Sequence, residues 1–153
     1  MRDLIDFAVK EAFDPVEDLF IHGGNAIPEP FIEYSDKIGL TSEWIQKFWH
    51  SHWRLLGAER ILEAFHRKFI NEIDLKKYLK RLDYTERDRE LVLSMSYNLL
   101  TRVDVRRIYE NGLMSTSELR EYYGSLGFSE RDKTLMTQLA QQLRFIDAKD
   151  LRS

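Results

Sequence analysis

The sequence predicts an all-α protein of three tandem three-helix repeats, each of about 44 residues, preceded by an N-terminal capping helix. Residues that end helices recur at a spacing of 44, and capped stretches of helical length lie between them. No run of alternating β-branched residues indicates a strand. Because one unit is too small to bury its own apolar face, the repeats are expected to stack as a short array or a compact bundle.

The repeat is clearest where the predicted helices end. Gly39, Asp83 and Gly127 are 44 residues apart, and each is followed by an apolar residue and then by a capping hydroxyl. A tyrosine stands five positions before each of them, at Tyr34, Tyr78 and Tyr122. The frame divides a single all-α domain, residues 1–153, into a capping helix (1–12), three repeats (13–56, 57–100 and 101–144) and a tail (145–153).

The N-terminal residues predict an amphipathic helix that covers the exposed end of the first repeat. Its apolar stripe consists of Leu4, Ile5, Ala8, Val9 and Ala12. The first repeat then begins with Asp14 as helix cap and Pro15 at the first helical position, and this helix ends at the glycine pair 23–24. A second helix is expected over Phe31–Ile38.

The next predicted helix, from Glu43 to about Leu55, is the most aromatic in the chain. Its broad apolar face consists of Ile45, Phe48, Trp49, His52 and Trp53. We expect Trp49 or Trp53 to be buried in the joint between the first two repeats. The equivalent faces in the second and third repeats carry smaller and more polar side chains. Either the tryptophan-rich face is the centre of the core, or the third repeat packs against something outside this chain.

The third repeat carries the strongest helix signals. Thr101 caps a first helix that ends at Gly112. Ser115 and Glu118 have the spacing of a capping box, which starts a second helix. Gly127 ends this helix, and a serine two residues later caps a third.

Composition limits the function. The formal net charge of −3 does not favour a dedicated nucleic-acid-binding protein, which would normally carry a basic excess. There is no cysteine, so disulfides and thiolate metal sites are excluded. No segment approaches the roughly 20 apolar residues of a membrane span, and acidic residues interrupt the N-terminus where a signal peptide would be apolar. We therefore expect a soluble protein that is not secreted by a signal peptide.

Histidines and carboxylates do not form a convincing metal site. His50 and His52 are two residues apart, so on a helix they point to different faces. Glu63 and His66 have the spacing found in di-iron bundles, but the other repeats do not reproduce the pair that such a site needs. We expect no metal, no cofactor and no bound small-molecule substrate.

Catalytic motifs are missing as well. His22-Gly23-Gly24-Asn25 is similar to an oxyanion loop, but no Gly-x-Ser-x-Gly elbow accompanies it, so a helix end is expected there. No nucleophile stands beside a plausible base, and the protein is predicted not to be an enzyme. The helix pair over residues 118–143 could form a DNA-reading helix-turn-helix, although its last helix is only weakly basic.

A cluster of charges at the start of the third repeat comprises Arg102, Asp104, Arg106 and Arg107. Arg102 and Arg106 are four residues apart and Asp104 lies on another side, so the shared face is basic. The simpler interpretation is a solvated helix with local ion pairs. The functional interpretation is an arginine contact to carboxylates, either between repeats or between subunits. With Trp49 and Trp53, these four residues are the predicted interaction residues.

A resemblance to a family of proteins rests on five stretches: Phe48-Trp49-His50-Ser51-His52-Trp53, His66-Arg67, Asp83-Tyr84, residues 101–109 and Gly127-Phe128. They resemble helical-repeat segments of uncharacterised virion structural proteins of tailed phages and proviruses. The resemblance covers most of the chain from Phe13 onward and implies no enzyme activity. It implies a location in a virion or in the host cytoplasm.

Together these observations predict a non-enzymatic structural or protein-interaction module, as part of a phage virion or of a larger phage protein. Its partners would be other proteins or further copies of itself in a larger particle. The alternative is a small helix-turn-helix-like regulator that binds nucleic acid. A helical-bundle metalloenzyme is a third possibility.

Overall fold

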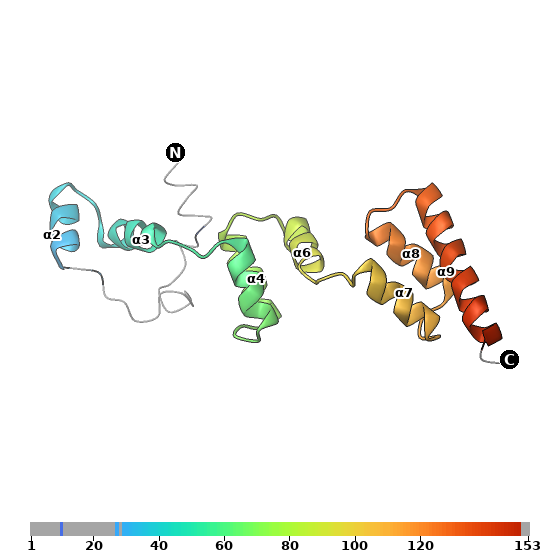
Figure 1. Ribbon diagram of the computed structural model, residues 1–153. Helices are drawn as coiled ribbons and strands as arrows, with labels where there is room; N and C mark the ends of the chain where they lie inside the picture. Colours follow the sequence, from blue (N-terminus) through green and yellow to red (C-terminus); the bar gives the residue numbers. More distant parts are fainter. Residues whose placement is uncertain (1–9, 11–26, 28, 151–153) are drawn as a thin grey trace. The chain divides into compact units, whose positions relative to one another are not determined.

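The computed structural model describes Lys10, Ile27 and residues 29–150, and this part of the chain is all-α with no strand (Figure 1). Its helices are α2 (Glu29–Lys37), α3 (Ser42–His52), α4 (Ala58–His66), α5 (Glu72–Arg81), α6 (Glu86–Met95), α7 (Arg102–Glu110), α8 (Thr116–Ser125) and α9 (Glu130–Asp150). The helix predicted between Asp14 and the glycine pair 23–24 lies outside the described residues. So does the capping helix, apart from Lys10, whose ammonium donates to the Ser51 carbonyl over 2.8 Å.

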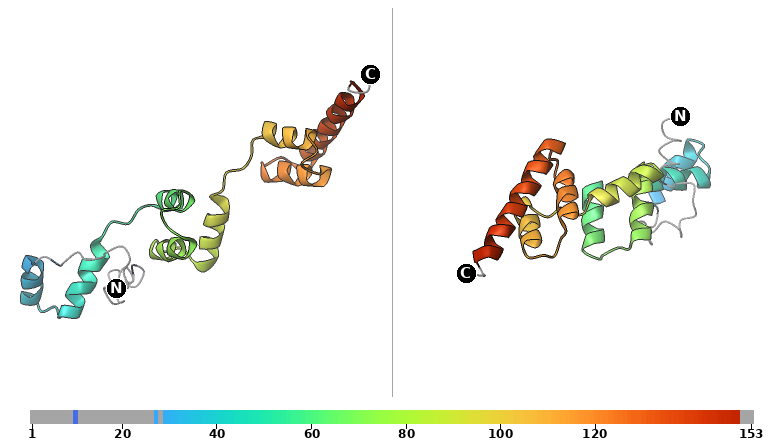
Figure 2. Two further views of the ribbon diagram at one scale, coloured as in Figure 1. Left: turned by 90° about the horizontal axis from the view of Figure 1, so that it is seen from below. Right: turned by 90° about the vertical axis from the view of Figure 1, so that its right-hand side faces the viewer.

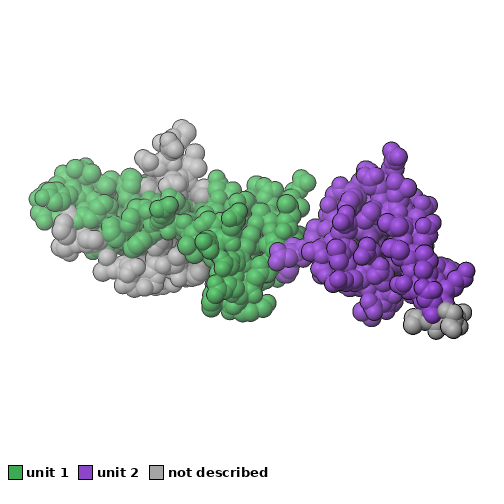
Figure 3. All heavy atoms as spheres, in the orientation of Figure 1, with its two compact units in different colours: residues 1–96 green, residues 97–153 purple. Residues whose placement is uncertain are grey.

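The chain divides into two compact units, residues 1–96 and residues 97–153 (Figure 3). The first unit contains α2 to α6 and the second contains α7 to α9.

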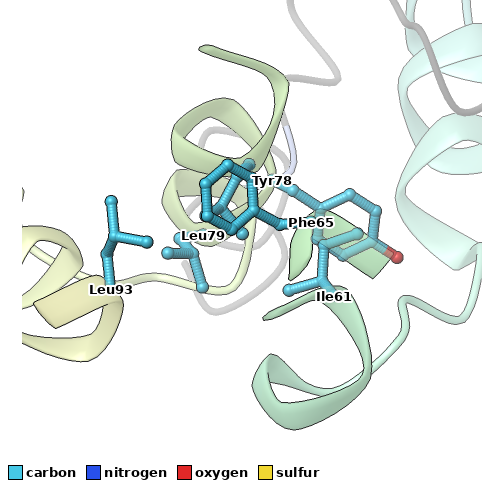
Figure 4. Close-up of a cluster of buried hydrophobic side chains, with 6 residues drawn as sticks. Ile61, Phe65, Tyr78, Leu79 and Leu93 are labelled. Carbon is cyan, nitrogen blue, oxygen red and sulfur yellow. The ribbon is translucent and has the colours of Figure 1, made fainter. Parts of the chain in front are cut away.

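The buried cluster of the first unit comes from α4, α5 and α6. It consists of Ile61, Phe65, Leu75, Tyr78, Leu79 and Leu93. Figure 4 shows the labelled side chains of this cluster gathered between the three helices. Leu75 and Leu79 have no exposed surface, because they lie on the face of α5 that meets the neighbouring helices.

The second unit packs α7, α8 and α9 side by side, as both views of Figure 2 show. Its buried cluster consists of Val105, Tyr109, Leu119, Tyr123 and Ala140. Helix α9 is 21 residues long and continues to Asp150. The predicted tail, residues 145–153, therefore begins inside this helix.

Helices end in the same way at positions 44 residues apart. The backbone φ angles of Gly39, Asp83 and Gly127 are 92°, 69° and 93°, in the left-handed region that glycine adopts most cheaply. The N–H of the next residue donates to the carbonyl five residues earlier, over 3.1 Å in each case: Leu40 to Ser35, Tyr84 to Leu79, and Phe128 to Tyr123. These bonds satisfy carbonyls at the end of each helix that have no partner within the helix.

Two tyrosines hold the chain segments that enter α4 and α7. The Tyr78 hydroxyl accepts the Leu56 N–H over 2.7 Å, and the Tyr122 hydroxyl accepts the Leu100 N–H over 2.8 Å. Both members of one pair lie 44 residues after those of the other. Two of the three recurring tyrosines therefore have the same role. Each lies on the second helix of a pair and holds the chain just before the first helix of that pair.

The helix caps predicted at Thr101 and Ser115 are confirmed. The Thr101 hydroxyl accepts the Asp104 N–H, and both hydrogen bonds of the Ser115–Glu118 capping box are present. Thr41 lies at the expected cap position of α3 and has the extended backbone of a cap residue. Its side chain, however, accepts no backbone N–H of α3, so the capping hydrogen bond is absent. Helix α3 also ends at His52, before the predicted end at Leu55.

Replacing Gly127 by alanine is expected to lower the free energy of unfolding by about 1 kcal/mol, from backbone strain alone. A Cβ at this position meets no atom within 4 Å, so no clash contributes. The reverse substitution can be made at Lys68, a non-glycine residue with a φ of 65°. Lys68→Gly relieves backbone strain, so it should leave the free energy of unfolding unchanged or raise it. Urea titrations of both variants measure the difference, and a neutral Gly127→Ala would contradict it.

Candidate interaction site

The predicted interaction residues lie on two helices. Trp49 and Trp53 lie on α3 in the first unit, and the charged cluster lies on α7 in the second. The two groups are therefore considered separately.

The tryptophans form an aromatic cluster with α2. The ring centroid of Trp49 lies 5.5 Å from that of Phe31, 4.1 Å from that of His52 and 5.7 Å from that of Trp53. Trp49 and Trp53 are half-buried, so the prediction that one of them is buried was wrong. The described ring contacts come from α2 and from neighbours one turn away on α3, and together they leave part of each ring open.

The histidines of α3 point to different faces, as predicted. His50 is buried, and this burial lowers the pKa of its imidazole, with His52 as a smaller cause. His52 is exposed and stacks beside Trp53, with 4.7 Å between ring centroids.

Glu63 and His66 have separate partners. The Glu63 carboxylate pairs with Arg60 and Arg67, which hold the pKa of this carboxyl below its usual value, Arg60 being the larger cause. The His66 Nε2 lies 2.8 Å from the Ser96 hydroxyl. Within residues 29–150 and the two isolated described positions, no three histidines or carboxylates gather where they could hold a metal ion.

The charged cluster of α7 separates into two parts. Arg102 and Arg106 line a pocket of about 220 Å³ together with Tyr123 of α8, and we call it the arginine pocket. Its apolar lining consists of Val103, Met136, Leu139 and Ala140. Asp104 is engaged elsewhere, since its carboxylate accepts the Thr101 hydroxyl over 2.7 Å, and Arg107 is exposed outside the pocket.

Tyr123 was not identified from the sequence. It has no exposed surface, and its hydroxyl has no hydrogen-bond partner in the part of the chain that the structure describes. Burial raises the pKa of the hydroxyl, and the nearby Arg106 and Arg102 oppose this effect. The signal available in the sequence was its position, because the equivalent residues of the first two repeats are Ser35 and Leu79.

Arg106 is partly solvated and forms a local ion pair on its own helix. Its side chain is 43% exposed, and its Nε lies 3.1 Å from the Glu110 carboxylate in a local ion pair. The Nε atom is itself buried and makes no well-aligned hydrogen bond among the described residues, so the pair holds the guanidinium in place only weakly.

Large apolar side chains are exposed in pairs at positions 44 residues apart. Three such pairs are Phe69 and Leu113, Leu91 and Leu135, and Met95 and Leu139, with exposed fractions between 46% and 81%. Leu91 and Met95 are one turn apart on α6, and their equivalents are one turn apart on α9. Each helix thus carries a short exposed apolar stripe.

Comparison of the chain with protein-family models, with curated proteins and with solved structures finds no match. In the described part of the chain, no helix has the length and apolar character needed to cross a membrane.

Proposed function

We propose that this chain is a non-enzymatic structural or protein-interaction module, as part of a phage virion or of a larger phage protein. The observation that carries the proposal is the repeated exposure of apolar side chains on α6 and α9. Single exposed leucines are ordinary, but stripes at equivalent positions are typical of surfaces that contact other proteins. The phage assignment is supported by the resemblance of the sequence to virion repeat proteins.

The proposal includes three tandem three-helix repeats behind a capping helix. The matched helix ends, the two tyrosine–linker bonds and the shared helix bounds support this architecture. Helices α4 and α5 span Ala58–His66 and Glu72–Arg81, and α7 and α8 begin and end 44 residues later. A repeated unit of this kind offers the same contact surface more than once, which suits assembly into a larger particle.

The expected test uses matched substitutions at equivalent positions. Leu91→Ser combined with Leu135→Ser should reduce partner capture or self-association, as followed by native mass measurement of the assembly. Arg87→Ser combined with Arg131→Ser, at exposed positions one turn earlier, is the control. All four positions are exposed, so each substitution should change the free energy of unfolding by less than about 0.5 kcal/mol. Equal association by both double variants would contradict a role of the apolar stripes.

The rival function is nucleic-acid binding through α8 and α9. Two basic side chains there, Arg120 of α8 and Lys133 of α9, are already paired with an acidic one. The Glu130 carboxylate at the start of α9 forms ion pairs with Lys133 and with Arg120, the latter over 3.0 Å. A recognition helix normally places its first residues against the bases and phosphates, where a carboxylate is repelled.

Accordingly, we expect no binding of duplex DNA tighter than about 10⁻⁴ M at physiological salt. Fluorescence anisotropy with a labelled duplex at several salt concentrations measures it. Tight binding that weakens steeply with salt would favour the regulator instead. Bound iron or manganese in the purified protein would favour the metalloenzyme.

A further inference from the structure

The arginine pocket combines two guanidinium groups with a buried hydroxyl that lacks a partner. Such a hydroxyl costs free energy unless it is hydrogen-bonded, and the Tyr123 hydroxyl finds no partner among the described residues. Arg102 and Arg106 line the same pocket as Tyr123, and their charges favour the ionised form of its hydroxyl. The lining of this small pocket thus includes three residues whose side chains carry hydrogen-bond donors.

The second repeat shows that helix packing does not require these groups. Ala58, Leu62 and Leu79 stand at the positions equivalent to Arg102, Arg106 and Tyr123. Leu79 belongs to the buried cluster of the first unit, and Ala58 and Leu62 pack against it. The three equivalent positions thus carry apolar side chains in the second repeat and hydrogen-bond donors in the third.

The charge and lining of the pocket define what fits there. One carboxylate, that of Glu110, lies beside the two guanidiniums through its weak ion pair with Arg106, so the group keeps an excess of positive charge. One carboxylate would match that charge, and guanidiniums bind carboxylates with two hydrogen bonds in favourable geometry. The lining of Val103, Met136, Leu139 and Ala140 suits the methylene groups of an aliphatic stem.

We infer that the arginine pocket binds the side chain of a glutamate presented by a protein partner. Arg102 and Arg106 hold the carboxylate, the Tyr123 hydroxyl donates a further hydrogen bond to it, and the apolar lining covers the stem. This inference rests on the proposed function, because it names the chemistry of one contact made by a protein-interaction module.

The probe for this pocket is N-acetyl-glutamate amide, with N-acetyl-glutamine amide as its neutral counterpart. The full chain is titrated with each at low salt, where exposed charges are screened least. Nuclear magnetic resonance signals of the Arg102 and Arg106 side chains should shift and saturate with the glutamate probe only. Equal shifts with both probes, or no saturable shift with either, would overturn the inference.

Three variants locate the binding. Arg106→Gln and Tyr123→Phe should each weaken binding of the glutamate probe about tenfold or more, since each removes a hydrogen bond to a charged group. Arg131→Gln removes the same charge from an exposed position of α9 outside the pocket and should leave binding unchanged. If Arg131→Gln weakened binding of the glutamate probe as much as Arg106→Gln, the binding would reflect only general attraction to the positive charges of the chain.

Tyr123→Phe also distinguishes a binding hydroxyl from a structural one. If the hydroxyl serves only a ligand, its removal should leave the melting temperature unchanged or raise it, because a buried unsatisfied group disappears. A lowered melting temperature together with unchanged probe binding would assign the hydroxyl to the fold and contradict the inference.

The failure of this inference is separable from failure of the proposed function. A protein partner captured equally well by wild type and Arg106→Gln would overturn the pocket assignment and leave the interaction module standing. Tight, salt-dependent DNA binding would overturn the module, whatever the glutamate probe does.

Discussion

Replacing Leu119 by alanine is expected to lower the free energy of unfolding by about 2–5 kcal/mol, the range for removing a buried leucine side chain. Leu119 has no exposed surface and lies in the cluster that contains Val105 and Tyr123. The loss is a large share of the roughly 5–15 kcal/mol by which a domain is stable. Urea denaturation followed by circular dichroism measures it as a shift of the midpoint at constant slope.

Leu113→Ala is the matched control, because the same atoms are removed from the same unit. Leu113 is 80% exposed, so its replacement should change the free energy of unfolding by less than about 0.5 kcal/mol. A comparable loss for both variants would mean that Leu113 is covered in solution, by a partner or by a second copy of the chain.

Truncating Trp49 or Trp53 to alanine should cost about 2 kcal/mol. A fully buried aromatic side chain would cost about 3–5 kcal/mol, and both rings are only half-buried. Arg106→Ala should cost less than about 1 kcal/mol, because its ion pair with Glu110 is partly exposed and therefore screened by water. Thermal melts of the three variants show which substitution destabilises the protein most.

A reversed order would change the interpretation of both groups. If Arg106→Ala destabilised the protein more than either tryptophan variant, the arginine cluster would be a structural joint. The aromatic cluster of α3 would then be better explained as a docking surface for a partner.

Local features of the fold were predictable from the sequence. The Thr101 cap and the Ser115–Glu118 capping box depend on hydrogen bonds between residues three positions apart, so the residue types alone specify them. The helix ends at Asp83 and Gly127 follow from the same kind of short-range geometry. An asparagine, aspartate or glycine that can adopt a positive φ is visible in the sequence before any packing is known.

The spacing of 44 residues between these signals is also visible in the sequence alone, and it pairs positions along the chain. It could not say what those positions contact. The bond from the Leu56 N–H to the Tyr78 hydroxyl joins residues 22 positions apart, and no local pattern indicates it.

The sequence determined the helical class and the caps, because those depend on interactions within about one helical turn. Only the tertiary structure decided the exposure of Trp49 and the grouping of the arginines. Trp49 is half-buried, with ring contacts to Phe31 of α2 and to residues of its own helix. Arg102 and Arg106 line one pocket with Tyr123 of α8 and residues of α9, and that grouping depends on how the three helices pack.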